Sequence, residues 1–388
     1  MSRYRWVVLA AGTVAAASYS AVLIGVSAIA PQIRGQYHLD LTEVGIVLAA
    51  SGIGSMFTLL PWGFLTDRVG ERAVMTIGLG GASATLFSVP AVGSFAAVVA
   101  LLVVAGASGA SVNAASGRAV MGWFAREERG LALGIRQTAI PIGGALAAVG
   151  LPWIASSAGV RWTFAALGAG CLVGALAGAI WLRDPPVEES TAADVVRGPL
   201  RDPAMWVLSV GSVLYLVAQL STMTFVVLFL HVHRGMSARH AADVLAVTQV
   251  LGIGARIGAG RWSDRVGSRL GPLQRIGVVL AFAMAAATAL VDAPLWLTVA
   301  AFVVAGVLGL SWNGLSFTAA AETAGAGRSG AAIGFQQTAL AVGSAPIPIL
   351  FAAIANGASW RVAYALAAAC PLLGVGAFRR LASSSSRP

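Results

Sequence analysis

The chain has 388 residues, of which 58% are hydrophobic and 10% are charged, and its formal net charge is +10. So few polar residues cannot cover a soluble protein of this length, which predicts an integral membrane protein. The basic residues are scattered through short loops between apolar runs. No basic face for nucleic acid is expected, and we predict no nucleic-acid partner.

Twelve apolar runs follow one another along the chain, and each is long enough for a helix that crosses a bilayer, which takes about 20 residues. The predicted helices cover about residues 6–30, a second run ending near 65, 73–91, 95–121, a fifth run ending near 155, 162–182, 204–231, 238–262, 273–291, 294–321, 329–355 and 359–379. Pro31 is expected to end the first helix, and prolines 141, 152, 346 and 348 are expected to bend helices five and eleven.

The longest polar segment divides these helices into two sets of six. We predict an N-terminal six-helix bundle over residues 1–182, a linker at 183–203, a C-terminal six-helix bundle at 204–380 and a tail at 381–388. With both termini inside, 17 arginines face the cytoplasm and five the outside, which favours a cytoplasmic N-terminus, linker and tail in a multi-pass inner or plasma membrane protein.

An internal repeat joins the two halves. The segment Gly130–Gly144, GLALGIRQTAIPIGG, returns as Gly330–Ser344, GAAIGFQQTALAVGS, so that Arg136 in the first copy stands against Gln336 in the second. Two six-helix halves of the same orientation follow, with a substrate site expected near the midplane between them.

A polar turn also occurs twice, as GFLTDRVGER at Gly63–Arg72 and GRWSDRVGSR at Gly260–Arg269. This G-x-x-x-D-R-x-G-x-R pattern resembles the signature of the major facilitator superfamily, and with the twelve spans the resemblance covers nearly the whole chain. It implies two six-helix bundles that give alternating access to a central cavity. It also implies a gating role for the charged residues of the two turns, Asp67, Arg68, Arg72, Asp264, Arg265 and Arg269; the simpler alternative is a capped turn with surface ion pairs.

Three arginines lie within predicted spans, Arg118, Arg136 and Arg256, and no carboxylate is expected at comparable depth. An unpaired arginine in a water-lined cavity favours an anionic substrate, and we assign this role to Arg136 and Arg256. For Arg118, near a helix end, we expect snorkelling or an ion pair with Asp67, Glu127 or Glu128.

Six amides accompany these arginines, and we predict that they bind the substrate through hydrogen bonds: Asn113, Asn313, Gln137, Gln249, Gln336 and Gln337. The alternative is that they join helices to one another, as polar side chains in membrane helices commonly do. The position of Arg256 is similar to that of an anion-contacting arginine in nitrate/nitrite and oxalate/formate exchangers. Met56, which matches Arg256 in the other half, departs from the nitrate pattern.

The sequence contains no GxSxG, Walker A or HExxH motif, so we predict neither an enzyme nor a cofactor or metal site. We predict a monomeric secondary transporter of a small organic anion such as a carboxylate, driven by a coupled proton or an exchanged anion. Two alternatives stay open. The segment Gly134–Gly144 is similar to the glycine-rich fifth-helix motif of exporting antiporters, which favours efflux of amphipathic drugs or metabolites, and a receptor that binds without transporting is the other.

Overall fold

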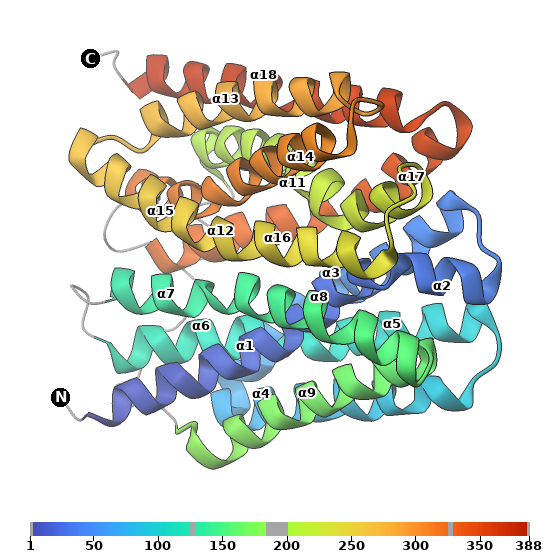
Figure 1. The fold of residues 1–388 in the computed structure, drawn as a ribbon. Coiled ribbons are helices and arrows are strands. Elements are labelled where there is room, and N and C mark those ends of the chain that lie inside the picture. The colour runs from blue at the N-terminus through green and yellow to red at the C-terminus, as the bar shows by residue number, and fades with distance from the viewer. Residues whose placement is uncertain (1–2, 125–128, 184–200, 325–328, 386–388) are drawn as a thin grey trace. The chain divides into compact units, whose positions relative to one another are not determined.

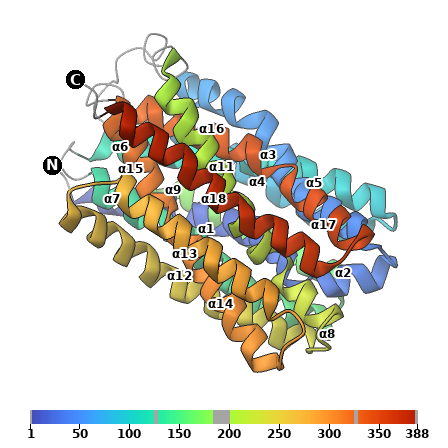
Figure 2. The same ribbon diagram turned by 90° about the horizontal axis from the view of Figure 1, so that it is seen from above.

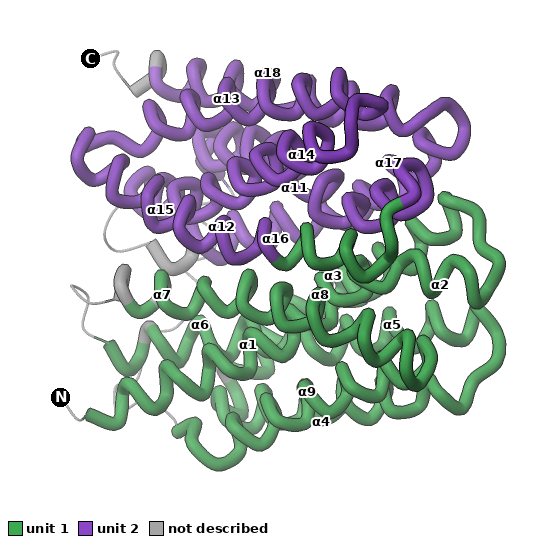
Figure 3. The backbone as a smooth tube through the Cα atoms, viewed as in Figure 1, with its two compact units in different colours: residues 1–189, 236–246 green, residues 190–235, 247–388 purple. Residues whose placement is uncertain are grey.

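The computed structural model describes residues 3–124, 129–183, 201–324 and 329–385. Within these ranges all regular secondary structure is helical, and twelve helical segments are long and apolar enough to cross a bilayer. The predicted all-α fold with twelve spans is confirmed. Two compact units divide the chain, unit 1 with residues 1–189 and 236–246 and unit 2 with residues 190–235 and 247–388 (Figure 3).

Unit 1 contains the first six spans. Its elements are α1 (Tyr4–Ala28), α2 (Ala30–Tyr37), α3 (Leu41–Val69), α4 (Glu71–Ser88), the short 3₁₀ helix η1 (Val89–Ala91), α5 (Phe95–Gly109), α6 (Ser111–Trp123), α7 (Arg129–Gln137), α8 (Ala139–Ser157) and α9 (Val160–Trp181). Helix α4 lies along α9, and α1 packs against both α8 and α9 (Figure 1).

Unit 2 contains the remaining spans, except that the first residues of α12 belong to unit 1. Its elements are α11 (Pro203–Val232), α12 (Ala238–Val266), α13 (Leu270–Ala289), α14 (Leu295–Ser311), α15 (Asn313–Ala324), α16 (Ser329–Ser344), α17 (Ile347–Gly357) and α18 (Trp360–Ser385). Helix α18 lies along α13 and packs on α11 (Figures 1 and 2). It extends to Ser385, into the segment predicted as a tail.

Pro31 begins a helix instead of ending one, which corrects the sequence prediction. Helix α1 ends at Ala28, and α2 begins at Ala30 with Pro31 in its first turn. The reason is that the first turn of a helix does not need the N–H that proline lacks, and the fixed φ of proline suits it.

Four spans are each built from two helices. The fourth span breaks at Ala110 and the tenth at Trp312, which are nearly matching positions of the repeat. The fifth breaks at Thr138 and the eleventh at residues 345–346. Proline explains the last two, because Pro141 removes the donor to the Gln137 carbonyl and Pro348 removes the donor to Ser344. Helix α8 continues through Pro152 without a break.

Candidate functional site

Arg136 lies in the last turn of α7 and is only 4% exposed. Its Nε donates to the Ser116 hydroxyl at 2.7 Å, and its Nη2 donates to the Asn113 backbone carbonyl at 3.4 Å, both on α6. In the described part of the chain no carboxylate pairs with it, and three of its five N–H groups have no hydrogen-bond partner. Unit 1 therefore contains a buried cation with N–H donors that no group in the described chain accepts.

Local backbone structure makes this buried charge tolerable. The carbonyl end of a helix carries partial negative charge, and Arg136 occupies that end of α7. The Asn113 carbonyl adds a second dipole from the first turn of α6, just after the break at Ala110. Arg136 therefore also joins α7 to α6 through a backbone carbonyl.

Unit 2 contains the second proposed counter-charge, Arg256, at a position of the repeat that differs from that of Arg136, and it is partly buried on α12. Its Nε donates to the Leu310 carbonyl at 3.2 Å, close to the break between α14 and α15. Gln249, two turns earlier on α12, is 1% exposed, and its Oε1 has no hydrogen-bond partner among the described residues. Asn313, the first residue of α15, likewise has a buried side-chain oxygen without a partner there.

Gln336 is fully buried, and both ends of its amide bind protein groups. Its Nε2 donates to the Ser316 hydroxyl at 2.8 Å, and its Oε1 accepts from the Ser209 hydroxyl at 2.6 Å. Ser212 extends the network by a hydrogen bond of 2.7 Å to Ser316. These contacts join α11, α15 and α16, so the geometry favours the interhelical alternative for Gln336 over substrate binding.

The other two predicted amides, Gln137 and Gln337, are partly buried at matching positions of α7 and α16. Gln137 directly follows the buried Arg136, and Gln337 directly follows the buried Gln336. The structure thus brings Arg136 and Asn113 together in unit 1, and it groups Gln336 with serines in unit 2.

The turn of unit 1 contains a buried carboxylate that the sequence analysis did not predict. Glu71 begins α4 and is 1% exposed, and its Oε1 lies 3.1 Å from Nε of Arg118 on α6. Arg118 therefore has Glu71 as an ion-pair partner. Of the partners predicted for it, Glu127 and Glu128 and the side chain of Asp67 lie outside what the structure describes. Arg68 and Arg72 are exposed.

The turn of unit 2 contains an ion-pair network centred on Arg269. Its Nη1 lies 2.5 Å from Asp264 Oδ1, and its Nε lies 2.8 Å from Oε1 of Glu322 on α15. Burial by itself lowers the pKa of Arg269, but the hydrogen bonds and charges of the two carboxylates outweigh it and raise the pKa. Arg265 is exposed.

The two turns therefore pair with the fourth span of their own unit in opposite senses. In unit 1 the acid Glu71 is on the turn and the base Arg118 is on the span. In unit 2 the base Arg269 is on the turn and the acid Glu322 is on the span. Each turn is thus tied to its own bundle by an ion pair.

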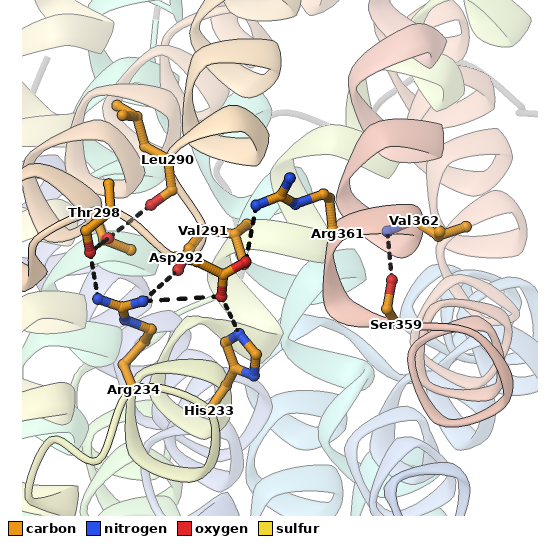
Figure 4. Close-up of polar contacts among 10 residues, drawn as sticks. His233, Arg234, Leu290, Val291, Asp292, Thr298, Ser359, Arg361 and Val362 are labelled. Carbon is orange, nitrogen blue, oxygen red and sulfur yellow. Dashed lines mark hydrogen bonds and ion pairs between the residues drawn. The ribbon is translucent and has the colours of Figure 1, made fainter.

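A second charge cluster lies at the other end of unit 2, where the carboxylate of Asp292 faces three basic side chains (Figure 4). His233 Nε2 and Arg361 Nη2 each lie 2.8 Å from it, and Arg234 lies 3.9 Å away. The hydrogen bond with His233 is the main cause that lowers the pKa of Asp292; slight burial opposes it, and the charges of His233 and Arg361 add to it. The cluster joins the ends of α11, α13 and α18.

Residues 8–348 match the family model of the Major Facilitator Superfamily. The chain belongs to the Major Facilitator Superfamily. The predicted family is thus confirmed, and the protein is a multi-pass membrane transporter.

Relatives within this superfamily cover nearly the whole chain. An uncharacterized MFS-type transporter of Mycobacterium tuberculosis is 32% identical over 96% of this chain and 84% of its own length. A probable sulfoacetate transporter of Cupriavidus necator is 26% identical over 92% of this chain and 89% of its own. A bacterial homologue of the human lysosomal transporter Spinster has the same fold, with a TM-score of 0.83 at 15% identity over 99% of this chain and 98% of that structure.

The sequence prediction missed the serines and the buried acid. Ser116 and Ser316 are matching residues of the repeat, each 20 positions before Arg136 or Gln336. That shared spacing was the available signal. Glu71 gave no signal of burial because it lies among the charged residues of a turn, where solvent exposure is the ordinary expectation.

Proposed function

We propose that this transporter carries a small organic anion, and that Arg136 provides a counter-charge for it. The observation that carries the proposal is the buried guanidinium, three of whose N–H groups have no partner among the described residues. A cation held this far from water is costly unless something compensates it. A carboxylate or sulfonate supplies both the charge and the oxygen acceptors that a guanidinium fork recognises.

Arg256 supports the same substrate class from unit 2. Its Nε is bound to the Leu310 carbonyl, and its helix also carries the buried oxygen of Gln249, which has no partner in the described part of the chain. An amide at this place suits the hydroxyl or protonated acid group of a polar organic anion better than a bare inorganic ion. The proposed hydrogen-bonding partners of the substrate remain the amides of Gln137, Gln337, Gln249, Asn113 and Asn313.

The relatives add support of a different kind. The probable sulfoacetate transporter is named for a small molecule with a sulfonate and a carboxylate. Sulfoacetate is therefore the first substrate to test, followed by carboxylates of similar size. Movement by alternating access, coupling to a proton or an exchanged anion, cytoplasmic termini and a monomeric state belong to the same proposal.

Uptake into proteoliposomes tests this function. The purified protein is reconstituted, and uptake of radiolabelled sulfoacetate, succinate and acetate is measured in the wild type, Arg136→Gln and Arg256→Gln. We expect saturable uptake of at least one anion and a rise in its KM of about tenfold or more in each variant, the loss of a charged hydrogen bond. Wild-type kinetics in both variants would contradict the charge argument.

The same preparation separates the alternatives. Efflux of amphipathic compounds predicts transport of lipophilic cations and no anion uptake. A receptor predicts that an anion raises the melting temperature of the purified protein without entering the vesicles, since a ligand stabilises the folded state by mass action.

A further inference from the structure

Ser116 lies beneath Arg136 and is itself almost fully buried, at 1% exposure. Its hydroxyl donates to the Val112 carbonyl of the same helix, α6, and accepts from Arg136 Nε at 2.7 Å. A serine hydroxyl has one proton and two lone pairs. Because the carbonyl takes the proton, a lone pair of Ser116 faces the guanidinium, and the serine can act on Arg136 only as an acceptor.

This contact decides which edge of the guanidinium is left for a ligand. Nε is occupied by Ser116, and one Nη2 proton points to the Asn113 carbonyl at 3.4 Å. The three N–H groups without a partner in the described chain therefore all belong to Nη1 and Nη2. Two oxygens of a carboxylate or sulfonate fit the end-on fork that these two nitrogens make, whereas the side-on fork, which needs Nε, is blocked.

We infer that Ser116 is a positioning residue for substrate recognition: it fixes the Arg136 guanidinium so that an anion is bound end-on through Nη1 and Nη2. The inference rests on the proposed function, because it assigns a geometry to the same anion. Ser116 acts through Arg136 and has no direct contact with the substrate in this assignment.

In the second copy of the repeat, the matching serine, Ser316, binds a glutamine instead of an arginine. Ser316 accepts from Gln336 Nε2 at 2.8 Å, as Ser116 accepts from Arg136. The Gln336 oxygen accepts from Ser209, so both ends of this fully buried, neutral amide are bound to protein groups. The serine is thus a shared support, and the residue that it supports is a cation in unit 1 and a neutral amide in unit 2.

The experiment compares Ser116→Ala and Ser116→Thr with the wild type, in both an Arg136 and an Arg136→Gln background. Uptake of sulfoacetate, succinate and acetate into proteoliposomes gives KM and kcat, and the melting temperature is followed with and without each anion. Ser83→Ala is the matched control, because Ser83 is also a buried hydroxyl of unit 1 but donates to the Gly168 carbonyl with no charged partner.

Loss of Ser116 frees Nε, so we expect Ser116→Ala to raise the KM for the transported anion about tenfold with kcat changed less than about twofold. The threonine variant, which keeps an acceptor, should restore KM. In the Arg136→Gln background the alanine change should have no further effect on KM, and Ser83→Ala should leave KM unchanged in either background.

Two results would overturn the inference, and they are distinct. If Arg136→Gln weakens anion uptake while Ser116→Ala alters only the melting temperature, Ser116 is structural and the positioning role is wrong, although the proposed function stands. If none of the three anions is taken up or stabilises the wild-type protein, the proposed function falls and the recognition geometry falls with it.

Discussion

Arg136 and Gln336 make the same hydrogen bond in the two halves of the repeat, each to the hydroxyl of a serine 20 positions earlier in the chain. The donor–acceptor distances are 2.7 Å for Arg136 and 2.8 Å for Gln336. The two halves thus share a polar joint between their fourth and fifth spans. They differ in the charge of the donor residue, and in the partners of the polar atoms of that residue that do not bind the serine.

Exchanging these two residues should have unequal effects on stability. Arg136→Gln keeps a donor for Ser116, and we expect the free energy of unfolding to change by about 1 kcal/mol or less. Gln336→Arg removes the acceptor that Ser209 needs and buries a cation without a carboxylate, so a loss of roughly 3–5 kcal/mol is expected. Thermal melting in detergent measures both, and equal shifts would contradict the proposed asymmetry.

The ion pair of Glu71 with Arg118 should be energetically coupled. Glu71 is almost fully buried while Arg118 is 30% exposed, so part of their attraction is screened by the surroundings. In a double-mutant cycle of Glu71→Gln and Arg118→Gln, we expect each single change to destabilise the protein and the coupling energy to be about 1–2 kcal/mol. Additive effects would show that the pair contributes nothing to the fold of unit 1.

The Asp292 cluster predicts a specific pH dependence. The pKa of Asp292 is lowered from its ordinary value of 3.8, so its contribution to stability is fully present above that value and is lost as the pH falls through the lower folded-state pKa. We therefore expect that, at pH values below about 4, the melting temperature of the wild type decreases more steeply with falling pH than that of Asp292→Asn. Parallel curves down to pH 3 would show that the carboxylate does not act in this way.

Two glycines of α3, only two positions apart, should respond oppositely to alanine. A Cβ at Gly54 would collide with the Val103 carbonyl oxygen on α5, whereas a Cβ at Gly52 would meet nothing within 4 Å. We expect Gly54→Ala to cost about 1–3 kcal/mol and Gly52→Ala to be neutral or to stabilise the helix by up to about 1 kcal/mol. Thermal melting of the two variants provides the measurement, each serving as control for the other.

The matching glycines of unit 2 should show the reverse order. There a Cβ at Gly252 would collide with the Leu310 side chain, and Gly254 is the open position. Gly252→Ala should therefore be the destabilising change, with a smaller cost than at Gly54 because a leucine side chain can move while a backbone carbonyl cannot. The same order in both halves would contradict the packing described for one of them.

The sequence by itself determined the twelve spans, the six-plus-six repeat and the family. Hydrophobic length fixes where a chain can cross a bilayer, and no tertiary contact is needed to read it. The paired polar turns and the Gly130 and Gly330 segments are local patterns of the same kind. Arg136 and Arg256 also stood out from sequence alone, because a charge inside an apolar run is conspicuous wherever the helices pack.

Only the tertiary structure decided what those residues touch. The sequence motif Gly-Ile-Gly occurs identically in α3 and α12, yet the second glycine is in close contact with a neighbouring helix in α3 and the first glycine in α12. The reason is that the rotation of a helix about its axis is set by the packing of its whole face. Glu71 and Arg118 are 47 positions apart, and Ser209 and Gln336 are 127 apart. No local pattern predicts such pairs, because they exist only once distant helices lie side by side.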